Sequence, residues 1–231
     1  MKDLTPFEKT IGVHFANKEL LVQAFTHRSY INENPKTGLK HNERLEFLGD
    51  AVLELVVTAY LFNAYPDKDE GELTAYRAAL VNSHTIADAA RALSMNEYLL
   101  LSRGESKDTG KARHYILANT FEAVVGAIYL DQGYAAAEKF LTENLLPKME
   151  EIVAKKLWRD AKSLIQEKAQ EHMSITPTYR VLGESGPDHD KQFSVGVFVG
   201  NEMLASAKGK SKQEAEQEAA RAALEAKDWL D

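Results

Sequence analysis

The pattern of apolar residues changes once along the chain, near residue 150, and this change most constrains the fold. Before that point, apolar residues recur at helical spacing in five segments, namely residues 18–25, 42–64, 72–93, 114–130 and 134–144. After it come a helical pattern at 160–172, strand-like runs at 178–184, 192–199 and 202–208, and an alanine-rich helical pattern at 211–227. We therefore predict an all-α domain over residues 1–150, a charged linker over 151–159, and a small α+β (α-β-β-β-α) domain over 160–231.

Composition narrows the possible functions. The 231 residues include no cysteine, which excludes disulfides, thiolate metal sites and a cysteine nucleophile. The N-terminus lacks the apolar core of a signal peptide. The longest uncharged stretch, residues 55–66, is shorter than the roughly 20 apolar residues needed to cross a bilayer. We expect a cytoplasmic protein with no membrane partner.

The helical segment that begins after Asn42 carries three acids on one face. At about 100° per residue, Glu43, Glu46 and Asp50 fall within about 60° of one another. Like charges this close repel, and the helix around them becomes apolar on nearly every face by residues 53–57, which predicts a buried central helix. A hard divalent cation with oxygen ligands, Mg²⁺ or Mn²⁺, would offset the repulsion. A solvated acidic face is the plainer alternative.

A second pair of oxygen ligands lies in the helical segment at 114–130. Asn119 and Glu122 are three residues apart, so they are neighbours on one face of a helix that is otherwise apolar. The two helices could therefore bring their oxygens to one metal cluster. Spacing alone does not establish that they meet.

The C-terminal domain is acidic overall but has one cationic cluster. Residues 160–231 contain 9 Lys and Arg against 13 Asp and Glu, a net charge of −4. Three of the cations, Lys208, Lys210 and Lys212, flank the start of the last helix, where backbone amides also favour phosphate. We interpret this cluster as a phosphate clamp.

Residues 42–50, Asn-Glu-Arg-Leu-Glu-Phe-Leu-Gly-Asp, resemble the nine-residue signature of the bacterial ribonuclease III family. Four further segments occur in the order that this family shows, residues 24–30, 69–74, 80–82 and 126–131, and the C-terminal unit resembles a double-stranded-RNA-binding domain. The resemblance implies a homodimeric endonuclease that cuts both strands of duplex RNA with Mg²⁺, which Mn²⁺ can replace, and with no organic cofactor. It implies products with 5′-phosphates, 3′-hydroxyls and two-nucleotide 3′ overhangs, in the processing of ribosomal and messenger RNA.

The resemblance also assigns roles within the helical domain. Glu46, Asp50 and Glu122 match metal ligands, Glu43 matches an acid that helps to order the cluster, and Glu70 matches an acid near the dimer and substrate groove. Asp50, Glu122, Glu43 and Glu70 are thus the expected catalytic set. Glu54 shares the acidic face but lies outside the signature, so we interpret it as structural. Phe47 is a candidate dimer contact, and ordinary core packing remains an equal alternative.

One position departs from the family pattern, because Asn119 stands where aspartate is usual. An amide oxygen can still bind Mg²⁺, but the site loses one negative charge and metal affinity should fall. We favour a working nuclease with Glu46, Asp50, Asn119 and Glu122 as metal ligands. The alternatives are a catalytically impaired duplex-RNA-binding protein and, less favoured, a structural dimer in a ribonucleoprotein.

The resemblance also assigns RNA contacts in the C-terminal domain. Gln166 and His189 match positions that enter the minor groove, and Ser211 opens the basic pattern at the last helix, in which Gln213 replaces a lysine. The expected RNA-binding set is Gln166, His189, Lys208, Lys210, Ser211 and Lys212. Because duplex RNA hides its bases in a deep groove, recognition should depend on shape more than on sequence.

Overall fold

The computed structural model describes residues 2–107, 110–154, 156–186 and 191–229 of the chain, and it divides into two units, Met1–Lys155 and Lys156–Asp231. The helices of the first unit are α1 (Thr5–Ile11), α2 (Lys18–Ala24), α3 (Arg28–Glu33), α4 (Glu43–Ala64), α5 (Glu70–Leu80), α6 (Ser83–Ala92), α7 (Arg103–Lys107), α8 (Lys111–Gln132), α9 (Tyr134–Asn144) and α10 (Lys148–Ala154), with short 3₁₀ turns at Pro35–Thr37 and Met95–Glu97. The second unit contains α11 (Ala161–Met173), β1 (Thr178–Ser185), β2 (Gln192–Val199), β3 (Glu202–Gly209) and α12 (Lys212–Ala226). This arrangement confirms the predicted fold class, an all-α domain followed by a small α+β domain.

Two predicted boundaries differ from those observed. The segment expected to be one helix over 72–93 is two helices, α5 and α6, because the side chain of Asn82 accepts a hydrogen bond from the backbone N–H of Thr85 and so starts a new helix. The charged segment expected to be a linker from residue 151 is helical through Ala154. There Met149 and Ile152 are buried, and α10 packs against α5.

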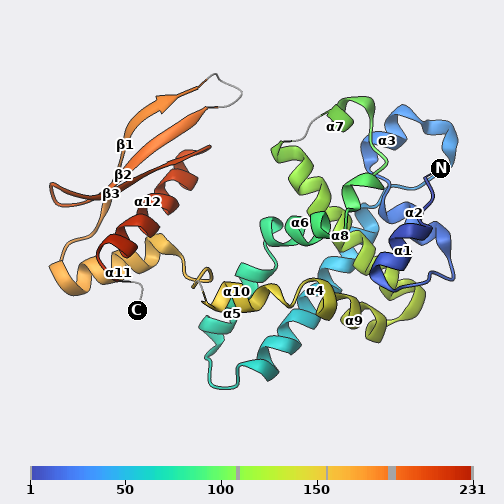
Figure 1. Cartoon of the computed structure of the whole chain (residues 1–231), viewed down its shortest axis with the longest axis horizontal. Coiled ribbons are helices and arrows are strands. Elements are labelled where there is room, and N and C mark those ends of the chain that lie inside the picture. Colours follow the sequence, from blue (N-terminus) through green and yellow to red (C-terminus); the bar gives the residue numbers. More distant parts are fainter. Residues whose placement is uncertain (1, 108–109, 155, 187–190, 230–231) are drawn as a thin grey trace. The chain divides into compact units, whose positions relative to one another are not determined.

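Helices α4 and α8 pack against each other at the centre of the helical unit (Figure 1). They cross so closely that glycine is required on both sides of the crossing. A Cβ atom at Gly49 would overlap the backbone carbonyl of Glu122, and one at Gly126 would overlap the carbonyl of Leu45. Each glycine therefore fixes the distance between the acid-bearing turns of the two helices.

The C-terminal unit is a three-stranded antiparallel sheet, in the order β1-β2-β3, with α11 and α12 packed on one face (Figure 1). The core between sheet and helices contains Val197 of β2, Ile165 of α11 and a row of buried residues on α12, namely Ala219, Ala220, Ala223 and Leu224. The small side chains of α12 let this helix lie close to the sheet, and a Cβ atom at Gly209 would come within 2.5 Å of the backbone nitrogen of Ala215. The alanine-rich pattern in the sequence is thus explained by close packing.

Within the described residues, no helix combines the length and the apolar character that a transmembrane span requires.

Substitution of Gly49 by alanine should destabilise the helical unit by about 3 kcal/mol, since a methyl group there displaces the backbone of α8. We expect a lower midpoint of urea unfolding, measured by circular dichroism. Gly104→Ala in α7 is the matched control, because its new Cβ would meet only the hydroxyl of Ser102 at 3.8 Å. Equal midpoints for the two variants would show that α4 and α8 do not cross at Gly49.

Candidate active site

The acids of the signature segment lie on the first two turns of α4. Asn42 precedes the helix and is buried, with its side-chain amide donating to the carbonyl of Ala24 at 3.2 Å instead of capping the helix. Glu43 and Asp50 are exposed, and Glu46 between them is half-buried. Helix α4 therefore presents carboxylates at the surface of the unit while its opposite side packs into the core.

Helix α8 contributes the second set of oxygens. Asn119 and Glu122 are half-buried, and the residues beside them, Ala118, Thr120, Phe121 and Ala123, are buried. The hydroxyl of Thr120 is fully buried and donates to the backbone carbonyl of Ile116 at 2.7 Å, so its proton is used within the helix. The polar edge of α8 is thus narrow and lies at the crossing with α4.

The electrostatics of these acids couple the two helices. Burial, together with the negative charges of Asp50 and Glu46, raises the pKa of Glu122 to about 8. The pKa of Glu46 is raised by burial and by the charges of Glu43 and Asp50, whereas a hydrogen bond from Asn119 opposes the rise. The acids predicted from two separate segments therefore act on one another across the Gly49 crossing.

The side chains of Glu46, Asp50 and Glu122 are close enough to interact electrostatically, but they do not form a metal-binding site in this structure. Among the described residues, no three carboxylate or imidazole groups are arranged as a metal-binding group. The roles of Glu46, Asp50, Asn119 and Glu122 as metal ligands therefore remain a prediction.

Glu43 has basic neighbours that sequence reasoning did not assign. A guanidinium nitrogen of Arg28 lies 3.4 Å from one carboxylate oxygen of Glu43, and Nδ1 of His41 lies 3.7 Å from the other. Arg28 belongs to one of the matching segments, but its spacing from Glu43 in sequence gives no sign that the two side chains meet.

Two other acids have roles predicted from the sequence, a structural one for Glu54 and a catalytic one for Glu70. Glu54 pairs with Arg77 of α5 at 3.2 Å, and the same guanidinium donates to the hydroxyl of Thr58 at 3.0 Å, in keeping with a structural role. Glu70 is the first residue of α5 and is exposed, and its catalytic role remains a prediction.

Helix α4 also carries an exposed apolar stripe. Phe47 is 81% exposed, Leu55 is 57% exposed and Phe62 is 71% exposed, and the three fall within about 80° around the helix axis. Core packing of Phe47 is therefore excluded within the single chain, and the expectation that α4 is buried on nearly every face is wrong at Leu55.

The predicted RNA-binding residues of the second unit are exposed where the structure describes them. Ser211 caps α12 by accepting from the backbone N–H of Glu214 at 3.2 Å, and Lys208, Lys210 and Lys212 surround this helix start. The sequence did not indicate their acidic neighbours. Glu214 accepts from the backbone N–H of Lys210 at 2.8 Å, and Glu184 lies 4.0 Å from the ammonium of Lys212.

Gln166 is exposed on α11 and borders a polar recess of about 360 Å³ that is also lined by Ser163, Gln213 and Tyr179. His189 lies outside the described residues, and so does most of the loop in which it was predicted to contact RNA.

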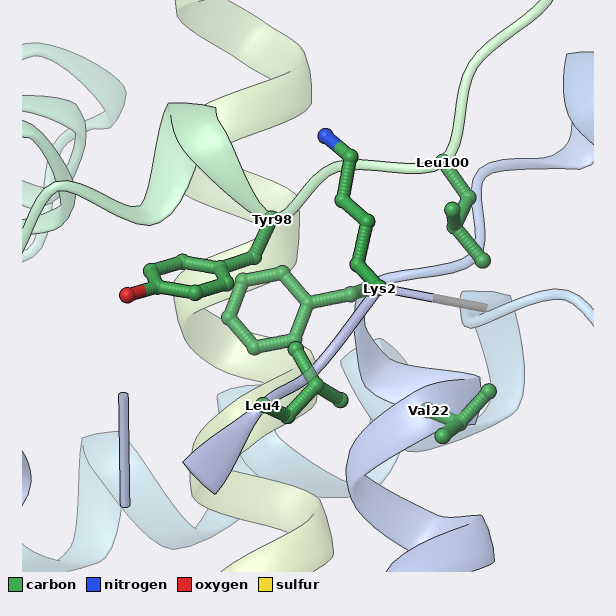
Figure 2. Close-up of a pocket in the computed structure, with 6 residues that line it drawn as sticks. Lys2, Leu4, Val22, Tyr98 and Leu100 are labelled. Carbon is green, nitrogen blue, oxygen red and sulfur yellow. The ribbon is translucent and has the colours of Figure 1, made fainter. Parts of the chain in front are cut away.

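A small, mostly apolar crevice in the first unit is a packing feature. Figure 2 shows it beneath the N-terminal segment, where Leu4, Val22, Tyr98 and Leu100 meet around Lys2, and its volume is about 10 Å³. The ammonium of Lys2 donates to the carbonyl of Leu99 at 3.2 Å. This space suits at most one water molecule and does not compete with the acids as a reaction site.

Comparisons with known proteins agree with this division of the chain. Residues 17–149 match the family described as Ribonuclease-III-like, and residues 161–227 match the double-stranded RNA binding motif. A protein named Ribonuclease 3 from Nitratiruptor sp. is 46% identical over 227 residues, which cover 97% of this chain and 96% of that protein. Another Ribonuclease 3, from Carboxydothermus hydrogenoformans, is 43% identical over 224 residues, or 97% of this chain and 95% of that protein.

A solved structure extends the similarity to the fold of the helical unit. The nuclease domain of ribonuclease III from Campylobacter jejuni superposes with a TM-score of 0.57 at 39% identity, covering 63% of this chain and 99% of that one. The chain therefore belongs to the ribonuclease III family, and it joins an endoribonuclease domain to a double-stranded-RNA-binding domain.

Proposed function

We propose that the protein hydrolyses both strands of double-stranded RNA at the acids gathered by α4 and α8. The observation that carries this proposal is the coupling of Glu122 on α8 to Asp50 and Glu46 on α4, with the pKa of Glu122 raised to about 8. Acids made costly to ionise in this way mark a site where a cation or a proton is needed. The catalytic set is then Asp50 and Glu122, with Glu43 and Glu70 as supporting acids.

The residues present fit a hard divalent metal. Glu46, Asp50 and Glu122 offer carboxylate oxygens and Asn119 offers an amide oxygen, which is the donor set that Mg²⁺ prefers, with Mn²⁺ as a substitute. A bound cation would also relieve the repulsion that raises the pKa values of Glu46 and Glu122. The hydrogen bond between Asn119 and Glu46 orients the latter, so Asn119 serves the site without adding charge.

The reaction is phosphodiester hydrolysis. A pair of metal ions, when bound, would activate the attacking water and offset the charge that develops on the scissile phosphate. The water oxygen joins phosphorus while the bond from phosphorus to the 3′ oxygen breaks, which leaves a 5′-phosphate on one fragment and a 3′-hydroxyl on the other. Glu122 is half-buried where the two helices cross, and Asp50 is exposed. Asp50 is therefore the acid that incoming RNA would meet.

The second unit supplies duplex RNA to this site. Lys208, Lys210 and Lys212 would bind phosphates, the capping Ser211 would present the first turn of α12, and Gln166 and His189 would reach the minor groove. Contacts of this kind measure the shape of A-form RNA and favour structured RNAs such as ribosomal and messenger precursors. We propose the reducing cytoplasm as the compartment.

A second copy of the chain would cover the exposed apolar stripe of α4. Two identical sites related by a twofold axis would cut opposite strands, and the offset between them would set the short 3′ overhang. Phe47 is the proposed contact because it is the most exposed large apolar side chain of the described residues.

The raised pKa of Glu122 predicts how stability depends on pH in the absence of metal. The folded state holds a proton on Glu122 up to about pH 8, whereas the unfolded chain releases it near 4.5, so stability falls as pH rises between these values. Thermal unfolding in EDTA should therefore show the Tm of wild type falling relative to Glu122→Gln from pH 5 to pH 8. Mg²⁺ should raise the Tm of wild type more than that of the variant. Parallel Tm curves for the two proteins would mean that the pKa of Glu122 is not raised in the folded state.

Incubation with long duplex RNA and Mg²⁺ should give short duplexes with 5′-phosphates and 3′ overhangs. Glu122→Gln should reduce kcat by about 10³-fold or more, because it removes a charged ligand at the point where the helices cross. Lys139→Gln, in an exposed ion pair with Glu143 on α9, is the control and should cut at the wild-type rate.

The same assay separates the nuclease from the alternative of an impaired RNA-binding protein. Asn119→Asp adds a charge to the metal site, so we expect cleavage at lower Mg²⁺ concentration with a kcat within about tenfold of wild type. Duplex RNA bound but never cut by wild type, with cutting only by Asn119→Asp, would establish the alternative instead. Failure to bind or cut RNA in every form would refute the proposed function.

Charge on the apolar stripe should dissociate the dimer. Phe47→Asp buries a carboxylate in the proposed contact, so we expect a monomer by analytical ultracentrifugation at concentrations where wild type is dimeric. Leu130→Asp, at a site 53% exposed on α8, is the matched control and should remain dimeric. A dimeric Phe47→Asp protein would remove Phe47 from the interface.

A further inference from the structure

We propose that Arg28, which is paired with Glu43, binds a backbone phosphate of the RNA beside the acid cluster. The inference deepens the proposed function and rests on it. Arg28 is the first residue of α3, and its guanidinium lies 3.4 Å from a carboxylate oxygen of Glu43 on the first turn of α4. The two side chains come from segments 15 residues apart and meet at the edge of the site.

Backbone hydrogen bonds fix these two segments against each other. The N–H of Asn42 donates to the carbonyl of Thr26 at 3.0 Å, and the side-chain amide of Gln23 donates to the carbonyl of His41 at 3.0 Å. The first turn of α4 is therefore tied to the chain that leads into α3. The distance between Arg28 and Glu43 is therefore set by these backbone hydrogen bonds as well as by the two flexible side chains.

The start of α3 is also held from its other side. The N–H of His27 donates to the carbonyl of Leu100 at 3.1 Å, and the hydroxyl of Ser29 accepts from the N–H of Ser102 at 3.0 Å. The ring of His27 caps the helix by accepting from the N–H of Ser29 at 3.3 Å. Arg28 thus extends from a turn anchored on both flanks, as a residue that must meet a substrate at a set place requires.

The charges explain why a cation is needed at this point. Glu43 lies three residues before Glu46 on α4, so its carboxylate adds to the negative field that an RNA phosphate would meet. Arg28 lies beside Glu43 and offsets that field locally. Without it, the RNA strand would approach an uncompensated row of acids.

Arg28 has donors to spare for a second anion. One guanidinium nitrogen faces Glu43 Oε1, and His41 flanks the other carboxylate oxygen at 3.7 Å, so the pairing with Arg28 is through one edge. The arginine side chain is 65% exposed, and a guanidinium carries five N–H donors in a planar fork that suits phosphate. An ordinary surface ion pair would use the same geometry but would contribute nothing to RNA binding.

The test compares full-length Arg28→Gln with wild type in two assays. Equilibrium binding to a short RNA duplex in EDTA, measured from about 50 to 200 mM KCl, should lose about one unit of slope in log K against log salt, because one phosphate contact is gone. In steady-state cleavage with Mg²⁺, KM should rise about 5-fold while kcat stays within about 2-fold, as expected when one charge-assisted hydrogen bond to bound RNA is lost. Arg28→Lys, which keeps the charge, should retain the salt slope.

Lys139→Gln is the matched control, because it also removes one cation from an exposed ion pair. It should leave both the salt slope and KM at wild-type values. Circular dichroism would show that the two glutamine variants are folded alike.

The outcomes distinguish the inference from the function on which it rests. A wild-type protein that cleaves duplex RNA, with an unchanged salt slope and KM in Arg28→Gln, would overturn the role of Arg28 alone. A fall in kcat with unchanged KM and slope would also overturn it, because Arg28 would then act only through Glu43. A wild-type protein that neither binds nor cuts duplex RNA would overturn the proposed function itself.

Discussion

The close crossing of α4 and α8 is the constraint on which the rest of the helical unit depends. Gly49 and Gly126 let two backbones approach where any Cβ would collide with a carbonyl, and this approach brings the polar edge of α8 to the acidic face of α4. Side chains on helices at ordinary spacing, about 8–10 Å between axes, would need a longer reach to interact. Gly49 of the signature segment and Gly126 of α8 are therefore as important to the acid cluster as the acids, although they carry no reactive group.

The crossing places carboxylates where ionisation is unfavourable, and the neighbouring residues change the free energy of ionisation in different ways. Burial and mutual repulsion raise the pKa values of Glu122 and Glu46, and the amide of Asn119 opposes the rise at Glu46 through a hydrogen bond. Arg28 and His41 flank Glu43 at the open end of the cluster, and Arg77 pairs with Glu54 further along α4. Glu43 and Glu54 thus have basic partners, whereas no ion pair of the described residues involves Glu46, Asp50 or Glu122. This difference is consistent with the proposal that the three acids share a cation.

Periodicity predicted most elements of the fold, because an amphipathic helix or strand repeats its apolar residues over many positions. It missed the break at Asn82 and the helical turn at 148–154, where one capping side chain or two buried residues decide the structure. The acid-bearing faces of α4 and α8 could be derived from spacing alone, but their meeting could not. It depends on backbone contact between Gly49 and Glu122, which are far apart in sequence. The pairing of Arg28 with Glu43 was not predicted either, because it also depends on how separate segments meet in space. The exposure of Phe47 and Leu55 could not be predicted either. On a helix with many apolar residues, the sequence pattern does not distinguish a residue that faces the core from one that faces solvent or a second chain.

The RNA-binding unit shows how an acidic domain can still hold a polyanion. Glu184 lies 4.0 Å from the ammonium of Lys212, and Glu214 accepts from the backbone N–H of Lys210, so a phosphate that binds at the start of α12 meets carboxylates beside the lysines. Repulsion from these carboxylates weakens phosphate binding. Weak binding by one such unit becomes adequate when a second contact with the same duplex is made nearby, since the second event is then intramolecular. The catalytic unit can provide that contact only if its acids do not repel the RNA, which is the physical reason for a cation at the edge of the cluster.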